Sequence, residues 1–144
     1  MEDMEELPEW PAGAVAILST GGGDAHAIPV STAMRAGPRT VVLALARRRD
    51  SLARLRREPS VALTLFGPDL ACTAHALAVV VEDPLAEAER VAAVRLDVTG
   101  IQDHRQARFA IEEGVRWRWT DPVGEARDAE VRAGLARLAA QLRS

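Results

Sequence analysis

The sequence predicts a mainly β protein: a small six-stranded barrel with short helices and one C-terminal helix. Short apolar or alternating runs of strand length recur along the chain, separated by turns that contain glycine or proline. The first of these runs follow one another without the intervening helices that an α/β sheet would require. The chain then closes with a longer amphipathic pattern, typical of a helix that covers a barrel.

The first predicted elements form a hairpin. Residues 14–19 are a short apolar strand and residues 25–33 are its return strand. The Gly21-Gly22-Gly23-Asp24 segment is the turn, since glycine adopts positive φ freely. Pro29 cannot donate a ladder hydrogen bond, so the return strand is expected at an edge, a bulge or a break. Phosphate binding by the glycines is a minor alternative, because no Walker or dinucleotide-binding pattern is present and no helix follows.

A pair of buried strands with a short helix between them comes next. Residues 41–45 and 61–66 have the length of buried strands and contain several β-branched residues. Asp50 or Ser51 can cap a helix between them. Pro59 disfavours helix at the residue before it, so this helix is expected to have about two turns.

The second half of the chain continues the β pattern. Residues 70–82 predict a long strand, and Asp83-Pro84 predicts the cap and first residue of a short helix that ends near Arg90. Residues 94–98 and 115–119 alternate apolar and polar side chains, which is typical of half-buried strands. Each of these two segments is therefore expected to join the sheet.

The last segment, from Glu125 to Leu142, predicts a helix with one apolar stripe. Gly134 costs this helix about 1 kcal/mol against alanine, so it is expected to allow close packing. Trp117 and Trp119 share one face of the strand predicted before the helix. They are expected to be core or dimer-interface residues.

Length and composition predict one domain. The chain has 144 residues, 48% of them apolar, and we divide it into an acidic lead, residues 1–12, and a single domain, residues 13–144. Trp10 of the lead is expected to fold onto the barrel.

The net charge of −3 argues against a nucleic-acid partner, and no apolar run is long enough to span a membrane. The acidic start is unlike a secretory signal, and Cys72 has no partner for a disulfide, so a cytoplasmic location is expected.

Three consecutive arginines, Arg47, Arg48 and Arg49, precede the short predicted helix. The free N–H groups and the positive dipole end of that helix face the same side as these arginines. The planar fork of arginine matches phosphate oxygens, so this stretch suits a phosphate monoester. The alternative is a solvated charged turn, because runs of charge are common at protein surfaces.

The remaining polar residues predict no metal or hydrolase site. Cys72 and His75 stand three apart on one predicted strand and therefore point to opposite faces, so Cys72 is expected to be a buried structural residue. His26, His75 and His104 lack metal-ligand spacing and are expected to be hydrogen-bonded or at the surface. Ser31 lacks the strand–turn–helix elbow of a serine hydrolase.

Three stretches together resemble the pyridoxamine 5'-phosphate oxidase-like split β-barrels, a family that includes flavin- and deazaflavin-binding proteins. The first is Ala16-Ile17-Leu18-Ser19-Thr20 with its glycine turn and His26-Ala27-Ile28-Pro29-Val30-Ser31, which is similar to the opening hairpin of the family. The second is the strand, basic turn and helix that lead into Leu55-Arg56-Arg57-Glu58-Pro59-Ser60-Val61-Ala62-Leu63. The third is the long strand that ends in Val81-Glu82-Asp83-Pro84. The resemblance covers roughly residues 13–84 and implies a split β-barrel.

The resemblance also implies a cofactor, FMN or alternatively a deazaflavin coenzyme. In the family, groups just after the hairpin proline touch the isoalloxazine ring, which corresponds here to Val30, Ser31 and Thr32. The family pocket is built by both chains of a homodimer, so a homodimer acting on a small-molecule substrate is expected. True pyridoxamine phosphate oxidases carry a C-terminal substrate-binding arginine segment. This chain lacks it, so that activity is not expected.

The phosphate-binding position departs from the family pattern. Many flavin-binding members carry a lysine eight positions before the proline of the Leu-Arg-Arg-x-Pro motif, where this chain has Ser51. Arg49 stands two positions earlier and can supply the charge, with Ser51 giving a hydroxyl and a backbone N–H. Arg47 and Arg54 are further candidates. The departure leaves open a decayed site or another ligand.

The functional hypotheses are therefore three. The first is an oxidoreductase whose bound flavin carries the redox chemistry, and for which the sequence singles out no catalytic side chain. The second is a non-catalytic flavin-binding or degenerate split-barrel module, which the departure at Ser51 favours. A haem-handling role, known in some relatives, is a weaker third, in which His26, His75 or His104 would supply an axial ligand.

Overall fold

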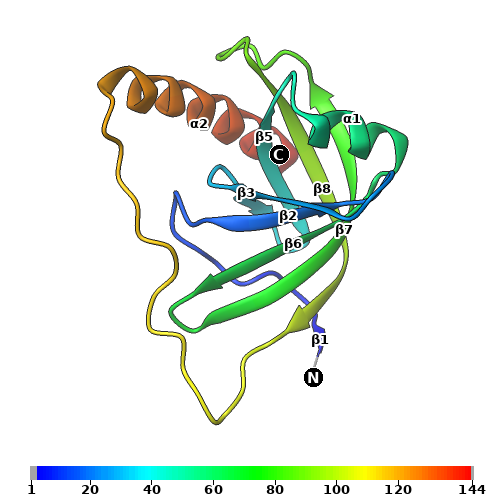
Figure 1. Cartoon of the computed structure of the whole chain (residues 1–144), viewed down its shortest axis with the longest axis vertical. Coiled ribbons are helices and arrows are strands. Elements are labelled where there is room, and N and C mark those ends of the chain that lie inside the picture. The colour runs from blue at the N-terminus through cyan, green and yellow to red at the C-terminus, as the bar shows by residue number, and fades with distance from the viewer. Residues whose placement is uncertain (1–2, 144) are drawn as a thin grey trace.

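The computed structural model describes residues 3–143, which form an open, strongly curled antiparallel sheet with two helices (Figure 1). The strands are β1 (Asp3–Met4), β2 (Ala16–Thr20), β3 (His26–Val30), β4 (Met34–Gly37), β5 (Thr40–Ala46), β6 (Ser60–Gly67), β7 (Leu70–Glu82) and β8 (Val91–Asp103). The helices are α1 (Asp50–Arg57) and α2 (Pro122–Arg143). Neither helix is long and apolar enough to cross a membrane.

The sheet order explains why the barrel is split. The strands pair in the order β3-β2-β6-β7-β8-β5-β4, and β1 pairs with the end of β8. β3 and β4 are thus the two free edges, and the sheet does not close. Pro29 lies in the edge strand β3, as predicted from its missing N–H. The mainly β split barrel with a C-terminal helix is confirmed, with eight strands in place of six. Six of the predicted segments form strands, residues 3–4 and 34–37 pair in addition, and residues 115–119 do not pair.

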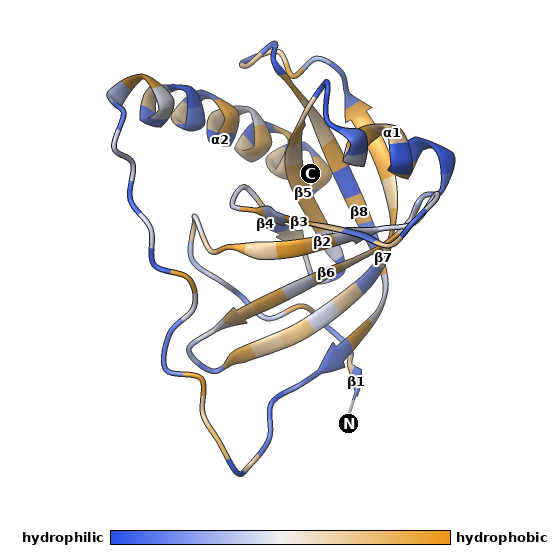
Figure 2. Ribbon diagram, viewed as in Figure 1, coloured by the Kyte–Doolittle hydropathy of each residue, from blue (hydrophilic) through white to orange (hydrophobic). Residues whose placement is uncertain are grey.

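The strand β5 is buried on both faces, which accounts for its continuous apolar sequence. Val41, Leu43 and Leu45 belong to the core inside the barrel. Val42 lies on the opposite face, in a second cluster that includes Leu135 of α2. Alternation of side chains along a strand produces this division. Figure 2 shows the result: β5 is largely hydrophobic, whereas α1 is largely hydrophilic.

Helix α2 packs on β4 and β5 through its apolar stripe. The predicted close approach at Gly134 is confirmed, because a Cβ atom built there would lie 2.8 Å from Cδ2 of the fully buried Leu85. Arg137 fixes the same contact from the side by pairing with Glu82 and Glu87. The glycine is thus a packing residue rather than a flaw in the helix.

The N-terminal lead lies against the barrel. Trp10 donates from Nε1 to the carbonyl of Ala33 at 2.8 Å and packs against the barrel core, as predicted. Leu7 is buried, and its backbone N–H donates to the carbonyl of Pro38 at 2.8 Å. The N–H group and the apolar face of the Trp10 ring therefore both contact the barrel.

The helix predicted from Asp83-Pro84 to Arg90 is wrong. The Asp83-Pro84 peptide bond is cis, and a turn follows in which Leu85 and Ala88 form an isolated β-bridge. Burial of Leu85 under α2 and binding of Glu87 by Arg137 fix this turn. Tertiary contacts here override the local helix signals.

The strand predicted over residues 115–119 is also wrong. Residues 104–121 contain no helix or strand and run outside the sheet from the end of β8 to α2, as the yellow-to-orange trace of Figure 1 shows. Trp117 donates from Nε1 to the carbonyl of Gly13 at 2.9 Å, and its ring meets that of Trp119 edge to face at 5.3 Å. Both tryptophans are about 40% exposed, so they are not core residues of this chain.

Candidate functional site

The basic turn lies where β5 leaves the sheet and α1 begins. Arg49 is the N-cap of α1, in extended backbone conformation and without a side-chain cap, so neither Asp50 nor Ser51 has the capping role predicted for them. Asp50 instead stands in the first turn and binds Nε of Arg54 at 2.6 Å. The guanidinium of Arg54 lowers the pKa of Asp50. The negative charge of Asp50 at this helix end is thereby balanced by the positive charge of Arg54.

Two arginines share one carboxylate beside this turn. Nη2 of Arg56 and Nε of Arg47 each lie 2.6 Å from a different oxygen of Asp83. The hydrogen bond from Arg56, followed in size of effect by that from Arg47, holds the pKa of Asp83 below its ordinary value. Asp83, predicted to be a helix cap, thus ties the end of β7 to the basic turn and to α1.

A cavity of about 580 Å³ opens on this side of the molecule. It is lined by Ala46, Arg47, Arg48, Pro84, Glu89 and Arg90. We call Arg47, Arg48, Arg49 and Arg90 the basic corner. The backbone N–H of Arg47 donates to the carbonyl of Arg90 at 3.0 Å, which joins the two segments of the corner.

The arginines of the basic corner differ in their partners. Arg47 is bound by Asp83, as described above. Within residues 3–143, the side chains of Arg48 and Arg49 meet no hydrogen-bond acceptor or carboxylate. The Arg90 side chain likewise has no partner among these residues, so three guanidinium groups at the corner remain free to bind an anion.

Ser51 is enclosed rather than exposed. Its side chain is 1% exposed, and its Oγ lies 3.1 Å from Nε2 of His26 on β3. This hydrogen bond joins the first turn of α1 to the edge strand of the barrel. The sequence singled out both residues but did not pair them, because they stand 25 positions apart.

Arg54 faces the glycine turn instead of the basic corner. Its Nη1 donates to the carbonyl of Asp24 at 2.5 Å, and its guanidinium lies against Gly23. Gly22 and Gly23 have positive φ values of 77° and 149°, which confirms the predicted turn. Arg54 therefore holds the hairpin against α1 and is not gathered with the other predicted phosphate ligands.

The predicted ring-contact segment lies where β3 ends. Val30 is buried, and the carbonyl of Ser31 accepts a hydrogen bond from Nη2 of Arg132 at 2.9 Å. Oγ1 of Thr32 accepts from the N–H of Ala44 at 3.1 Å and donates to its carbonyl at 3.4 Å. Thr32 thereby completes the hydrogen bonding of β5 at a point beyond its pairing with β4.

These contacts place the two groups of predicted residues along one strand. Thr32 binds Ala44, and Ala46 two residues further on lines the cavity of the basic corner. Two residues of a strand span about 7 Å. The structure thus places Thr32 against β5, directly after Val30 and Ser31, while Arg47 and Arg49 follow the end of that strand.

Other site features were not found from the sequence. Arg48 belonged to the arginine triplet but was not selected, and Arg90 was assigned to a helix that does not form. A charge count around a turn cannot tell which arginine has a carboxylate partner. That information depends on Asp83, which reaches the turn only through the fold.

Cys72 lies away from this site. It is buried, and burial, with the Asp103 carboxylate nearby, raises the pKa of its thiol to about 11. His75 on the same strand is exposed, so the two point to opposite faces as predicted. Within residues 3–143 no cluster of histidine, cysteine and acidic residues could hold a metal ion.

Comparison with known proteins identifies the fold. No protein-family model and no curated protein matches the chain. Among solved structures, a protein provisionally described as a pyridoxamine 5'-phosphate oxidase from Lactobacillus delbrueckii matches with a TM-score of 0.59 and 18% identity, over 71% of this chain and 99% of that one. Flavin reductase PheA2 matches with a TM-score of 0.51 and 13% identity, over 65% and 81%.

A third similar structure has a different ligand in its name. The heme binding protein from Mycobacterium smegmatis matches with a TM-score of 0.56 and 17% identity, over 82% of this chain and 56% of that one. Identities at this level establish the fold alone. The fold that the resemblance implied is confirmed: the chain has the split β-barrel of pyridoxamine 5'-phosphate oxidase-like proteins and flavin reductases.

Proposed function

We propose that this protein binds a flavin, FMN or alternatively a deazaflavin coenzyme, with the phosphate at the basic corner. The observation that carries the proposal is the unpartnered guanidinium group of Arg48, which lines an open cavity of about 580 Å³, followed in the chain by the unpartnered Arg49 at the start of α1. Flavin reductase PheA2 has the same fold, which supports a flavin as the ligand.

The electrostatics of the corner suit a phosphate. The N-terminal N–H groups of α1 add their positive dipole end to the arginines. Asp50 would repel an anion at this point, but its carboxylate is bound by Arg54. A phosphate monoester carries close to two negative charges at neutral pH and accepts the paired N–H groups of arginine. Arg48 and Arg49 fit this group better than the buried hydroxyl of Ser51 does.

The flavin ring would lie along β5 against the segment Val30–Thr32. Ser31 and Thr32 are held by Arg132 and Ala44, so their backbone is fixed without a ligand. A fixed segment of this kind orients a bound ring at little entropic cost. The flavin would supply hydride or electron transfer when bound, and the chain would supply position and phosphate binding.

We also propose that the protein is a homodimer. Leu77, Val79 and Val81 form a row on the outer face of β7 and are 46%, 39% and 37% exposed. The row ends two residues before Asp83, which borders the basic corner. A symmetric contact between two such rows would bring a second chain beside each corner. The exposed Trp117 and Trp119 are further candidates for this contact.

The proposed activity is an oxidoreductase reaction on a small molecule in the cytoplasm. The alternative is a module that holds the flavin without turnover, which the enclosure of Ser51 by His26 favours. Haem binding is less well supported, because Nε2 of each histidine is already bonded, to Ser51, Thr73 or Gln102. Binding of haem iron through Nε2 would require that hydrogen bond to break.

Fluorescence titration with FMN and riboflavin tests the proposal, since the two ligands differ by the phosphate alone. We expect FMN to bind more tightly than riboflavin. Arg48→Ala and Arg49→Ala should each weaken FMN binding about tenfold, a loss typical of a charge-assisted hydrogen bond, and leave riboflavin binding unchanged. Arg116→Ala, which removes a largely exposed arginine from the distant segment 104–121, is the control.

Equal affinity for FMN and riboflavin would contradict the phosphate assignment, as would unchanged FMN binding in both variants. Turnover is a separate question. Reduction of the bound flavin by a nicotinamide cofactor, followed by reoxidation, would support the oxidoreductase. A bound flavin that resists reduction would support the non-catalytic module.

A further inference from the structure

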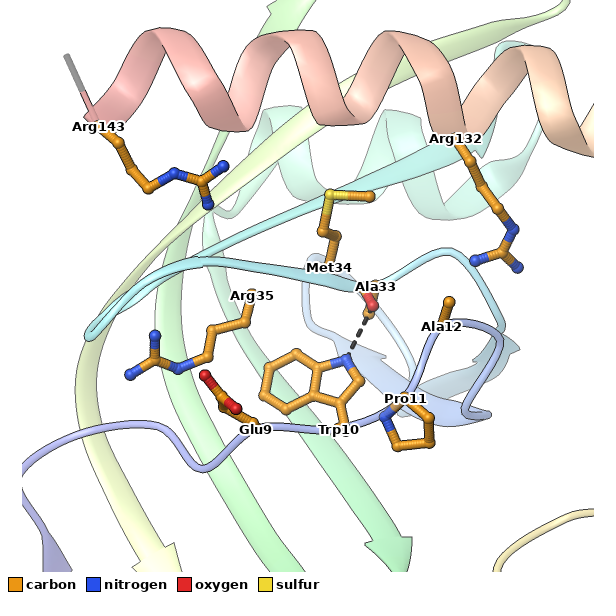
Figure 3. A pocket seen from close by; sticks show the side chains of 9 residues that line it. All are labelled: Glu9, Trp10, Pro11, Ala12, Ala33, Met34, Arg35, Arg132 and Arg143. Carbon is orange, nitrogen blue, oxygen red and sulfur yellow. Dashed lines mark hydrogen bonds between the residues drawn. The ribbon is translucent and has the colours of Figure 1, made fainter.

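A second cavity, of about 290 Å³, lies between the N-terminal lead, β4 and α2 (Figure 3). It is lined by Glu9, Trp10, Pro11, Ala12, Ala33, Met34, Arg35, Arg132 and Arg143. None of these residues lines the cavity of the basic corner. The second cavity is therefore a separate candidate site, which we call the Trp10 cavity.

The tryptophan at the centre of this cavity has a fixed orientation. Nε1 of Trp10 donates to the carbonyl of Ala33 at 2.8 Å, so its indole N–H is not available to a ligand. The ring lies below Met34 and next to Glu9 in Figure 3. An immobilised indole offers a flat surface to another aromatic ring at low entropic cost.

Three arginines from two elements, β4 and α2, lie around the indole (Figure 3). Arg35 is positioned by a hydrogen bond from Nε to the carbonyl of Leu7 at 3.1 Å. Arg132 is positioned by Asp128 and by the carbonyl of Ser31. Each keeps other N–H groups that no described residue accepts.

Arg143 completes the set from the end of α2. It stands eleven residues after Arg132 and therefore on the same side of the helix, about 16 Å along its axis. Its side chain has no acceptor within residues 3–143 and points toward the cavity in Figure 3. Glu9 is the one carboxylate in the lining. The cavity is thus positively charged in a protein with a net charge of −3.

We propose that the Trp10 cavity binds a planar aromatic anion. The ring would lie against the indole of Trp10, and carboxylate or phosphate oxygens would accept hydrogen bonds from Arg35 and Arg143. The volume is at the lower end of the range for small-molecule sites, which fits a ligand with one ring rather than a flavin. This binding does not require the flavin proposed for the basic corner.

Arg132 connects the Trp10 cavity to the proposed flavin site. Arg132 lines the cavity and also binds the carbonyl of Ser31, in the segment proposed to contact the flavin ring. A ligand in this cavity would therefore share Arg132 as a neighbour with that segment. A substrate or a regulator of the flavin site could both bind there, and the binding chemistry is the same for either.

Titration with isophthalate tests the proposal, and isophthalamide, its neutral analogue of the same shape, is the matched ligand. Isothermal calorimetry should show isophthalate binding at least tenfold more tightly than isophthalamide. The NMR signal of the Trp10 indole N–H, assigned with Trp10→Phe, should shift, while those of Trp117 and Trp119 should not. Phenyl phosphate tests whether the arginines prefer phosphate to carboxylate oxygens.

Arg35→Ala and Arg143→Ala should each weaken isophthalate binding about tenfold, while Arg116→Ala, which removes the same charge elsewhere, should not change it. Arg48→Ala should also leave it unchanged, which separates this site from the basic corner. Absence of isophthalate binding, equal binding of isophthalamide, or unchanged affinity in both arginine variants would overturn the proposal. Arg143 is exposed at the end of α2, so its variant should fold normally.

Discussion

Two arginines of this chain show how differently one residue type is used. Arg137, on α2, donates from Nε to Glu87 at 2.7 Å and from Nη2 to Glu82 at 2.5 Å. The two carboxylates raise its pKa, Glu87 contributing most. Arg48, in the basic corner, lines a cavity and meets no acceptor among residues 3–143. One arginine has its charge balanced within the chain and the other does not.

The difference separates structural from binding residues. A side chain whose donors are satisfied internally has little left to offer a ligand, and its loss exposes its partners. A side chain with unused donors beside a cavity contributes little to the folded state but can bind an anion. Substitution of Arg137 should therefore lower stability and leave ligand affinity unchanged. Substitution of Arg48 should lower ligand affinity and leave stability unchanged.

The largest effect is expected where Gly134 of α2 packs closely on Leu85. Gly134→Val would place Cβ 2.8 Å from Leu85 Cδ2, and Leu85 is fully buried and cannot move aside. Overpacking of this kind should lower the free energy of unfolding by about 2–3 kcal/mol, even though valine favours the helix slightly more than glycine. Urea denaturation measures the loss.

Ala136→Val, on the exposed side of the same helix, is the control and should change stability by less than about 0.5 kcal/mol. A fully stable Gly134→Val protein would show that α2 can shift away from Leu85. Close packing of α2 against Leu85 would then not be required for stability.

Arg137→Met keeps most of the side-chain volume and removes the charge. Glu82 and Glu87 would lose their shared partner, so the melting temperature should fall by about 2–4 °C at pH 7. The affinity for FMN should not change, because Arg137 lines neither cavity. Arg48→Ala should give the reverse pattern. A loss of FMN affinity in Arg137→Met with normal stability would contradict the division between the two arginines.

The sequence predicted the parts of the fold whose signals are local. The bounds of β7 matched the predicted residues 70–82, and the glycine turn, the helix α1 and the helix α2 were found from turn chemistry, proline and apolar periodicity. Residues 115–119 show the limit of such signals. Their alternation is that of a strand, but among residues 3–143 no strand pairs with them.

The site was predicted less completely than the fold. The three arginines before a helix are visible in the sequence, and the structure places Arg47 in the lining of the cavity, whereas phosphate binding by Arg47 or Arg49 stays a prediction. Their partners were not visible, since the Asp83 carboxylate comes from a turn that the sequence assigned to a helix. Arg54 was selected by proximity along the chain, yet its side chain serves the glycine turn.

Thr20 tests whether every unmatched polar group serves binding. Its side chain is 6% exposed, points into the barrel from β2, and its hydroxyl has no partner within residues 3–143. Thr20 lines neither the Trp10 cavity nor the cavity of the basic corner, in contrast to Arg48. Thr20→Val keeps the shape and removes the hydroxyl, so it should stabilise the protein by about 1 kcal/mol and leave FMN affinity unchanged.

Thr64→Val is the matched control, because that hydroxyl is bonded to Thr73 at 2.9 Å. It should destabilise the protein by about 1 kcal/mol. Destabilisation by Thr20→Val would show instead that its hydroxyl is satisfied in solution.

The smallest expected effect is also the most discriminating, since it changes a balanced arginine into an unbalanced one. Asp83→Asn removes the carboxylate that Arg47 and Arg56 share and leaves the shape of the turn. With Arg47 released, FMN should bind about threefold more tightly, a modest gain because exposed charges are screened. Riboflavin binding should not change, and the gain should vanish at high salt.

The pH dependence of stability gives an independent check on the same variant. The bonds from Arg56 and Arg47 lower the pKa of Asp83 from its ordinary 3.8. The stabilisation from this carboxylate is therefore fully present above about pH 4 and is lost as the pH falls through the lowered pKa. Asp83→Asn should remove that part of the acid-side loss. If FMN affinity falls instead of rising, Asp83 is needed to position Arg47 for the phosphate, and a paired arginine can then be a binding residue after all.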